Sequence, residues 1–180
     1  MKFIPALWLA AALIVRAAEP AQPKVVLMDA ETAAKEILTP DPFFDRLTTL
    51  DMSLRIGVEL EPARRDEDMD LFKEFLRENV RNWTPAEKEL VMPALKDAAG
   101  KIKTVYPKLM PAEWSFIKTT GREEGGATYT RGRHIILSQS TIGNLEEGKF
   151  QQFVRETIHE TVHIYLRAHP EQKPALYKAI

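Results

Sequence analysis

The sequence contains no cysteine among its 180 residues, so it can form no disulfide and offers no site for lipoprotein-type acylation. It also lacks an excess of either charge, because the chain contains 25 Lys and Arg residues and 26 Asp and Glu residues. Such a balance is not the electrostatic signature of a nucleic-acid-binding protein, and we expect no nucleic-acid partner. Its 44% of hydrophobic residues and 28% of charged residues are typical of a globular protein, with room for one domain and a sizeable core.

Long hydrophobic runs are also lacking, apart from one near the N-terminus, between Ala6 and Val15. The run follows the basic Lys2 and precedes the small residues Ala17 and Ala18, which is the pattern of a secretory signal peptide. It is short for a membrane span, so a cleaved signal over residues 1–18 is favoured over a retained anchor. No stable membrane span is then expected after cleavage. Export without disulfides favours a secreted or periplasmic bacterial protein.

Beyond the signal, we expect a linker over residues 19–28 and a single domain over residues 29–180, with no internal repeat. Helix-start signals and apolar spacing predict a mainly helical front half. The helices expected there cover 29–38, 41–56, 66–80 and 84–103, the last of them opened by a capping box at Thr84.

The second half of the chain has a different pattern. Residues 114–119 are expected to form a strand, and 127–130 with 134–137 a hairpin around Arg131-Gly132-Arg133. A long helix should follow, from about Glu147 to Arg167. The sequence therefore predicts an α+β domain in which a mostly helical N-terminal half precedes a small antiparallel sheet or hairpin and then this helix.

The most informative run in the chain lies on that last helix: His159-Glu160-Thr161-Val162-His163. Imidazoles four residues apart lie one helical turn from each other, so both can reach one metal ion. The adjacent glutamate can then hold and deprotonate water bound to the metal. The bare pattern should occur by chance in well under about 1% of chains of this size. The alternative interpretation is a solvated helix face that carries two histidines.

An apolar stripe on the same helix is expected to face the core, more than about 90° from the histidine pair. The predicted stripe consists of Phe150, Val154, Ile158, Thr161, Val162 and Tyr165. This arrangement would leave the two imidazoles facing a cleft.

The stretch from Thr157 to Tyr165 resembles the active-site helix of the zincin (HExxH) zinc metallopeptidases. Residues 120–137 also resemble a segment of uncharacterised bacterial zincin-like proteins. The resemblance implies a zincin-like fold, a Zn²⁺ cofactor and hydrolysis of a peptide bond in a peptide or protein substrate. It further implies that His159 and His163 bind zinc and that Glu160 is the general base. In a zincin N-terminal lobe, an edge strand can pair with an extended substrate by backbone hydrogen bonds.

A third zinc ligand is less evident, although a catalytic zinc normally takes three protein ligands. Metzincins continue as His-x-x-Gly-x-x-His, and His169 has that spacing, but Leu166 occupies the place of the glycine. Gluzincins, which the chain resembles more closely, use a glutamate from a following helix, and Glu171 is the acidic residue after His163. We expect a C-terminally truncated chain or a degenerate metal site rather than a new ligand geometry.

Several polar residues of the predicted hairpin are candidates for contact with the substrate or the transition state. Tyr129, Arg131, Arg133 and His134 could stabilise the negative charge of a tetrahedral intermediate, or they could be solvated residues of an exposed hairpin. Two other function classes also stay open: a non-catalytic binding or scaffold protein that keeps the zincin fold with an incomplete metal site, and a purely helical interaction protein.

Overall fold

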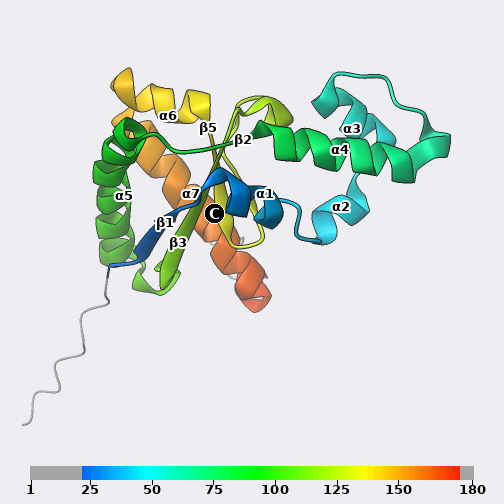
Figure 1. Cartoon of the computed structure of the whole chain (residues 1–180). Coiled ribbons are helices and arrows are strands. Elements are labelled where there is room, and N and C mark those ends of the chain that lie inside the picture. Colours follow the sequence, from blue (N-terminus) through cyan, green and yellow to red (C-terminus); the bar gives the residue numbers. More distant parts are fainter. Residues whose placement is uncertain (1–21, 175–180) are drawn as a thin grey trace, which may run out of the picture.

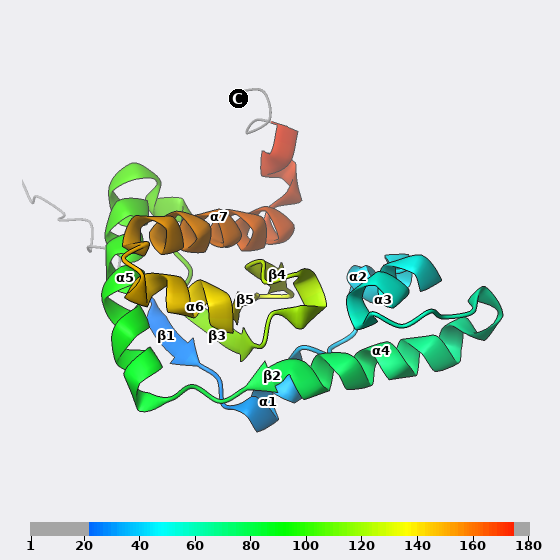
Figure 2. The same ribbon diagram turned by 90° about the horizontal axis from the view of Figure 1, so that it is seen from above.

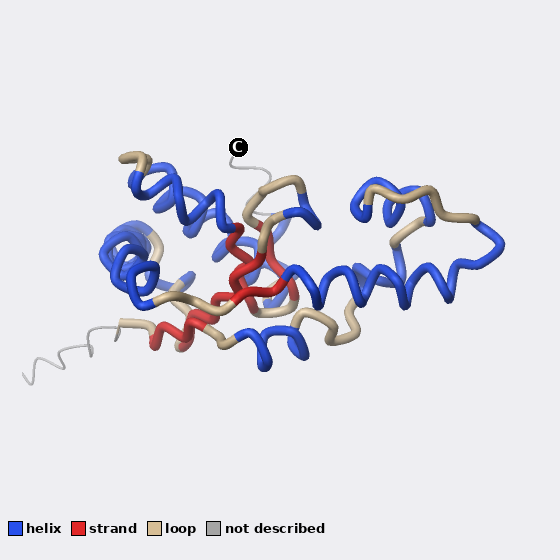
Figure 3. Tube along the Cα trace, turned by 45° about the horizontal axis from the view of Figure 1, so that its top comes forward, coloured by secondary structure: helices blue, strands red, loops and turns tan. Residues whose placement is uncertain are grey.

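The structure is a computed structural model that describes residues 22–174, so the expected signal peptide, residues 1–18, lies outside the described residues. No helix within residues 22–174 is long and apolar enough to cross a membrane. Helices surround a small central sheet (Figures 1 and 3). The helices and strands in chain order are β1 (Lys24–Leu27), α1 (Ala30–Glu36), α2 (Pro42–Arg46), α3 (Thr49–Ile56), α4 (Arg65–Asn79), β2 (Val80–Arg81), α5 (Pro85–Val105), β3 (Glu113–Thr119), β4 (Tyr129–Arg131), β5 (His134–Ser138), α6 (Gln139–Glu146) and α7 (Phe150–Ala168), with short 3-10 turns at Pro62–Arg64, Pro107–Leu109, Arg122–Glu124 and Pro170–Gln172.

The α+β class is confirmed, but the sheet is mixed where a small antiparallel sheet was predicted. Its strand order is β1-β3-β5-β4, and β2 also pairs with β3. Strand β3 runs parallel to β1 and to β5, whereas β4 is antiparallel to β5 and β2 is antiparallel to β3. The predicted hairpin is present as β4 and β5. The sheet is mixed because β3 pairs in parallel with both β5 and β1, and the prediction placed Lys24–Leu27 in the linker over residues 19–28. Those four residues form β1, which lies parallel to β3.

The two faces of the sheet are covered by different helices (Figure 2). Trp114, Phe116, Ile135 and Leu137 pack on the face covered by α5, α6 and α7. Ile117 and Ile136 pack on the opposite face, against α1. Neighbouring residues of a strand point to opposite faces, so the register of β3 and β5 decides which side chains can reach α7.

Most predicted helices are present, with one correction. Asp29 caps α1, and Thr84 opens α5 with the expected capping box. The single helix expected over 41–56 is instead two helices, α2 and α3. The chain is extended at Leu47 and Thr48, and the Thr48 side chain caps a new helix in a capping box with Asp51. Together with α4, these helices enclose a separate apolar cluster beside the sheet (Figure 1).

Helix α7 is fixed to the sheet by a buried hydrogen bond. The indole Nε1 of Trp114 donates to Oγ1 of Thr161 at 3.1 Å, and that hydroxyl donates to the carbonyl of Thr157 at 2.7 Å. The apolar stripe is rotated from its predicted position: Val154 and Thr161 are buried, but so are Phe153, Thr157, Glu160 and Leu166. Tyr165 and Val162 are only partly buried. This rotation directs Glu160 toward the sheet and leaves both histidines at the solvent-facing edge.

Gly121 sets the start of the loop that leads from β3 to β4. Its φ is +84°, and a Cβ there would lie 2.6 Å from the Cβ of Ser138 and 3.1 Å from the Cα of Gly126. We expect Gly121→Ala to lower the free energy of unfolding by about 3 kcal/mol, because left-handed strain and overpacking add. Urea unfolding measures the loss. Gly57→Ala is the matched control, since Gly57 also has a positive φ but has nothing within 4 Å of its Cβ position. Equal losses in the two variants would show that the contact with Ser138 is not the cause.

Candidate metal centre

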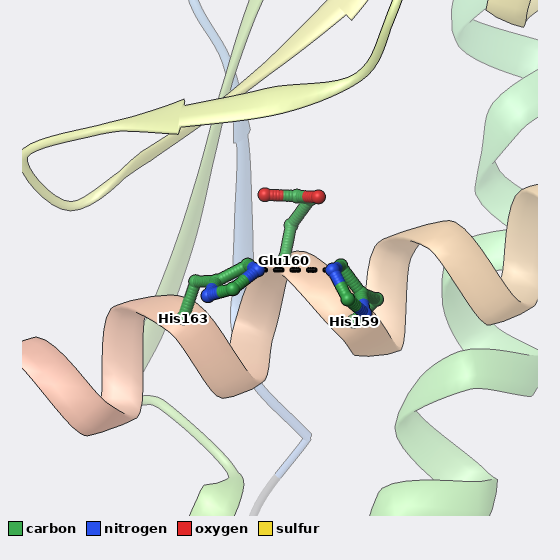
Figure 4. A group of neighbouring side chains, drawn as sticks. All are labelled: His159, Glu160 and His163. Carbon is green, nitrogen blue, oxygen red and sulfur yellow. Dashed lines mark hydrogen bonds between the residues drawn. The ribbon is translucent and has the colours of Figure 1, made fainter. Parts of the chain in front are cut away.

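The structure brings together the three residues that the sequence placed at a metal site. Within residues 22–174, the group of potential metal ligands is His159, Glu160 and His163, whose ligand atoms all lie within 4.8 Å of one another. The Nε2 atoms of His159 and His163 are 2.9 Å apart, and their rings meet edge to face at 83° (Figure 4). Because α7 is a regular helix here, the four-residue spacing alone gives this arrangement.

The two imidazoles fit a zinc ion. Zinc binds His nitrogen at about 2.0–2.1 Å, so two ligands of a tetrahedral site lie about 3.3 Å apart, close to the observed spacing. Metal binding needs the neutral imidazole. The pKa of His163 is lowered, first by burial and then by the neighbouring His159, Arg167 and Lys173, which favours that neutral form. Both histidines are exposed, so an ion can reach them from solvent.

Glu160 is the buried member of the group, with 7% of its surface exposed. It extends toward the β4–β5 hairpin (Figure 4) and lines a cleft of about 420 Å³ between α7 and residues 128–130. Burial raises its pKa to about 7; Arg167 lowers it in part and Glu156 adds to the rise. A carboxyl with a pKa near neutrality can both accept and return a proton at physiological pH. Such a group suits the role of general base and acid.

The raised pKa of Glu160 predicts a pH-dependent stability of the metal-free protein. The folded pKa of about 7 exceeds the ordinary value of 4.5, so folding loses stability as pH rises from 4.5 through 7. A shift of this size corresponds to about 3 kcal/mol, of which we expect about 1–2 kcal/mol because water reaches the cleft. With chelator present, Glu160→Gln should therefore be more stable than the unsubstituted protein at pH 8 and about equal to it at pH 4.5.

Urea unfolding at the two pH values tests this expectation. Glu89→Gln is a control, because Glu89 is exposed on α5 and has no hydrogen-bond partner among the described residues. It should change stability little at either pH. The assignment of a raised pKa would be contradicted if the difference in free energy of unfolding between Glu160→Gln and the unsubstituted protein were the same at pH 4.5 and pH 8.

Neither candidate for a third ligand joins the group. His169 follows the end of α7, and its ring centroid lies 4.4 Å from that of Tyr165, with the two rings tilted by 39°. It lines a separate hollow. Glu171 lies 3.6 Å from His169 and is exposed. The helix continues unbroken through Leu166, so His169 is rotated away from His163. Within the described part of the chain, the candidate metal centre therefore consists of two imidazoles and the Glu160 carboxylate.

Most of the hairpin candidates lie on the wrong face of the sheet for this centre. Tyr129 packs with the cluster under α1, and its hydroxyl lies 3.2 Å from the buried carboxylate of Glu123. Arg131 is buried, pairs with Asp41 at 3.1 Å and lies over the rings of Phe43 and Phe44. Arg133 is exposed in the hairpin turn itself. Arg131 therefore lies away from Glu160. Tyr129 lines the cleft with Glu160, although its hydroxyl points toward Glu123 on the other side of the sheet.

His134 is also remote from the metal centre. It pairs with Arg131 across the hairpin and lies opposite Ser115 of β3, on the α1 side of the sheet. Its Nδ1 is 2.9 Å from the Ser115 hydroxyl and its Nε2 is 3.2 Å from Glu36. Burial lowers the pKa of His134, while Glu36 counteracts this effect. The Ser115-His134-Glu36 array resembles a hydrolytic triad in outline. Ser115 is buried, however, so the array links two strands and a helix rather than meeting a substrate.

Sequence reasoning missed the residues that do face the metal centre from the hairpin. Thr128 and Thr130 line the cleft with Glu160, and Arg167 lies beside them one turn after His163. The Thr128 hydroxyl donates to Glu156, and Arg167 donates to the Thr130 hydroxyl. Alternation along the strand gives Thr128 and Thr130 the opposite orientation to Tyr129 and Arg131, but it does not tell which of the two sets faces α7.

Comparison with known proteins identifies no relative: no family model matches the chain, and no curated protein or solved structure matches it either.

Proposed function

We propose that the protein is an exported zinc-dependent peptidase of zincin type. The observation that carries the proposal is the pair of imidazole nitrogens 2.9 Å apart beside a buried carboxylate whose pKa is raised to about 7. His159 and His163 would hold the ion. Zinc supplies Lewis acidity, which makes water acidic near neutral pH and polarises a peptide carbonyl.

The role of Glu160 follows from its position in the cleft. Its carboxylate has no hydrogen-bond donor among residues 22–174, so it is available to accept a proton from water. With a pKa near 7, the resulting carboxylic acid can then give that proton to the departing amine. The neighbouring Arg167 limits the rise of this pKa and keeps a fraction of Glu160 ionised at neutral pH.

The edge of the sheet supports a peptide as substrate. Strand β4 ends the strand order, and its residues Thr130 and Tyr129 line the cleft that holds Glu160. An exposed strand edge presents backbone donors and acceptors that can pair with an extended peptide. The free edge of β4 would therefore place a peptide backbone along α7, over the metal centre.

Cleavage of an unstructured protein tests this proposal. We expect the purified full chain to cut casein slowly without added metal, to lose this activity with a chelator and to regain it when zinc is restored. Magnesium should not replace zinc, because two imidazoles favour a borderline-soft ion. Cleavage that continues unchanged in chelator would contradict a zinc-dependent mechanism.

The second candidate is a non-catalytic binding or scaffold protein with the same fold. The observation in its favour is the metal centre of residues 22–174, which has no third ligand besides Glu160. If Glu160 completes the coordination of zinc, it is not free to act as a base. This candidate predicts zinc binding without cleavage, whereas the peptidase predicts both.

A further inference from the structure

A second groove, of about 880 Å³, lies next to the metal-centre cleft, between α2, the β4–β5 hairpin and the end of α7. The cleft and the groove share three lining residues, Tyr129, Thr130 and Arg167. A substrate that enters the cleft can therefore extend into the groove.

The groove has an unbalanced positive charge. Five arginines and two carboxylates line it. Both carboxylates are already paired: Asp41 with Arg131 at 3.1 Å, and Glu124 with Arg55 at 3.1 Å. Two ion pairs thus leave three arginines that have no acidic partner from the groove, namely Arg46, Arg133 and Arg167.

Arg167 is held in place by uncharged acceptors, and the carboxylates of Asp41 and Glu160 act on it only from beyond ion-pair distance. Its guanidinium donates to the Gly132 carbonyl at 3.0 Å and to the Thr130 hydroxyl, both of which are uncharged acceptors. Arg46 likewise donates to the carbonyl of Pro42 at 3.0 Å. Neither arginine forms an ion pair with any residue of the described chain. The third, Arg133, is 3.9 Å from Glu113, a carboxylate that Lys24 contacts more closely, at 3.0 Å.

We propose that this groove binds a carboxylate of the substrate, close to the bond that is cut. The carboxylate is either an Asp or Glu side chain or the C-terminus of the peptide, because a guanidinium recognises both in the same planar geometry. Arg167 is the principal contact, since it lines both cavities and its position is fixed by the hairpin. The location of the cut bond rests on the proposed function, but the charge of the groove does not.

Binding of three matched peptides tests the proposal. The peptides are rhodamine-labelled decapeptides of one alanine- and phenylalanine-rich sequence: the first carries a central Glu and an amidated C-terminus, the second a central Gln and a free C-terminus, and the third a central Gln and an amidated C-terminus. Fluorescence anisotropy is measured on the full chain at low salt with chelator, because zinc would itself attract a carboxylate and cleavage would remove the probe.

We expect at least one of the two carboxylate peptides to bind about 5-fold or more tightly than the third peptide, and which one it is identifies the source of the carboxylate. Arg167→Gln should reduce this preference to less than about 2-fold. Arg46→Gln should also reduce it, and because the Arg46 side chain is exposed this variant keeps the test valid if Arg167→Gln folds poorly. Arg155→Gln is the matched control: Arg155 is exposed on the same helix outside the groove and should leave the preference unchanged.

The result of this binding test can be distinguished from the result of the cleavage test of the proposed function. Equal binding of all three peptides, or an equal loss of preference in Arg155→Gln, would overturn the carboxylate groove whether or not the protein cleaves peptides. A clear preference that depends on Arg167, in a protein that cuts nothing when zinc is restored, would support the groove and contradict the peptidase.

Discussion

Glu160→Gln is expected to lower the rate of peptide cleavage by about 10²- to 10⁴-fold while the protein keeps its zinc. The amide has nearly the shape of the carboxylate, so His159 and His163 remain one turn apart on α7 and 2.9 Å from each other. What the variant loses is the group that accepts a proton from water and returns it to the leaving amine. Initial rates of peptide cleavage and the zinc content of the same sample measure both effects.

Glu156→Gln is the matched control for this prediction. Glu156 lies one turn before Glu160 on the same helix, but its carboxylate is occupied by the Thr128 hydroxyl at 3.2 Å and by the Gln152 amide at 2.9 Å. We expect this variant to keep most of the activity. A Glu160→Gln protein that cleaves peptides at the normal rate would show that Glu160 is not the base.

His163→Ala is expected to weaken zinc binding by more than about 100-fold, and His159→Ala by a similar factor. Loss of residues that merely orient a metal ligand already costs about 10- to 100-fold in affinity, so removal of a ligand should cost more. Titration with a competing chromogenic chelator measures the affinity. Cleavage should fall with zinc occupancy, because the proposed chemistry needs the ion.

His169→Ala provides the control, since it removes a third exposed histidine from the end of α7 and leaves the 2.9 Å pair intact. It should bind zinc as the unsubstituted protein does. An equal loss of zinc affinity in His169→Ala would mean that the chain end folds back to supply a third ligand, contrary to the position of His169 beside Tyr165.

Local signals in the sequence predicted the elements that depend on local interactions. The helix caps at Asp29 and Thr84 and the helical spacing of His159 and His163 in α7 depend on interactions within a few residues. The structure confirms all three. Strand β1 escaped prediction because a stretch of only four residues next to Pro23 has no periodicity to measure. It is stabilised by a partner, β3, that lies about ninety positions away in the sequence.

Helical geometry was sufficient to predict the histidine pair of the candidate metal centre, but the sheet residues beside that pair could not be predicted in the same way. The pair His159 and His163 follows from the helical repeat alone. The contribution of the hairpin depends on which face of the sheet meets α7, and that is fixed by long-range register, such as Ser115 opposite His134. Sequence proximity suggested Tyr129, Arg131 and His134. Of these three, Tyr129 lines the cleft, together with Thr128, Thr130 and Arg167, which the sequence did not single out.

Anomalous diffraction at the zinc absorption edge, from crystals of the full chain grown with zinc, tests the central claim most directly. We expect one strong peak about 2.0–2.1 Å from Nε2 of both His159 and His163. A crystal with no peak between these two nitrogens, or with zinc bound elsewhere and the imidazoles still in contact with each other, would contradict the account.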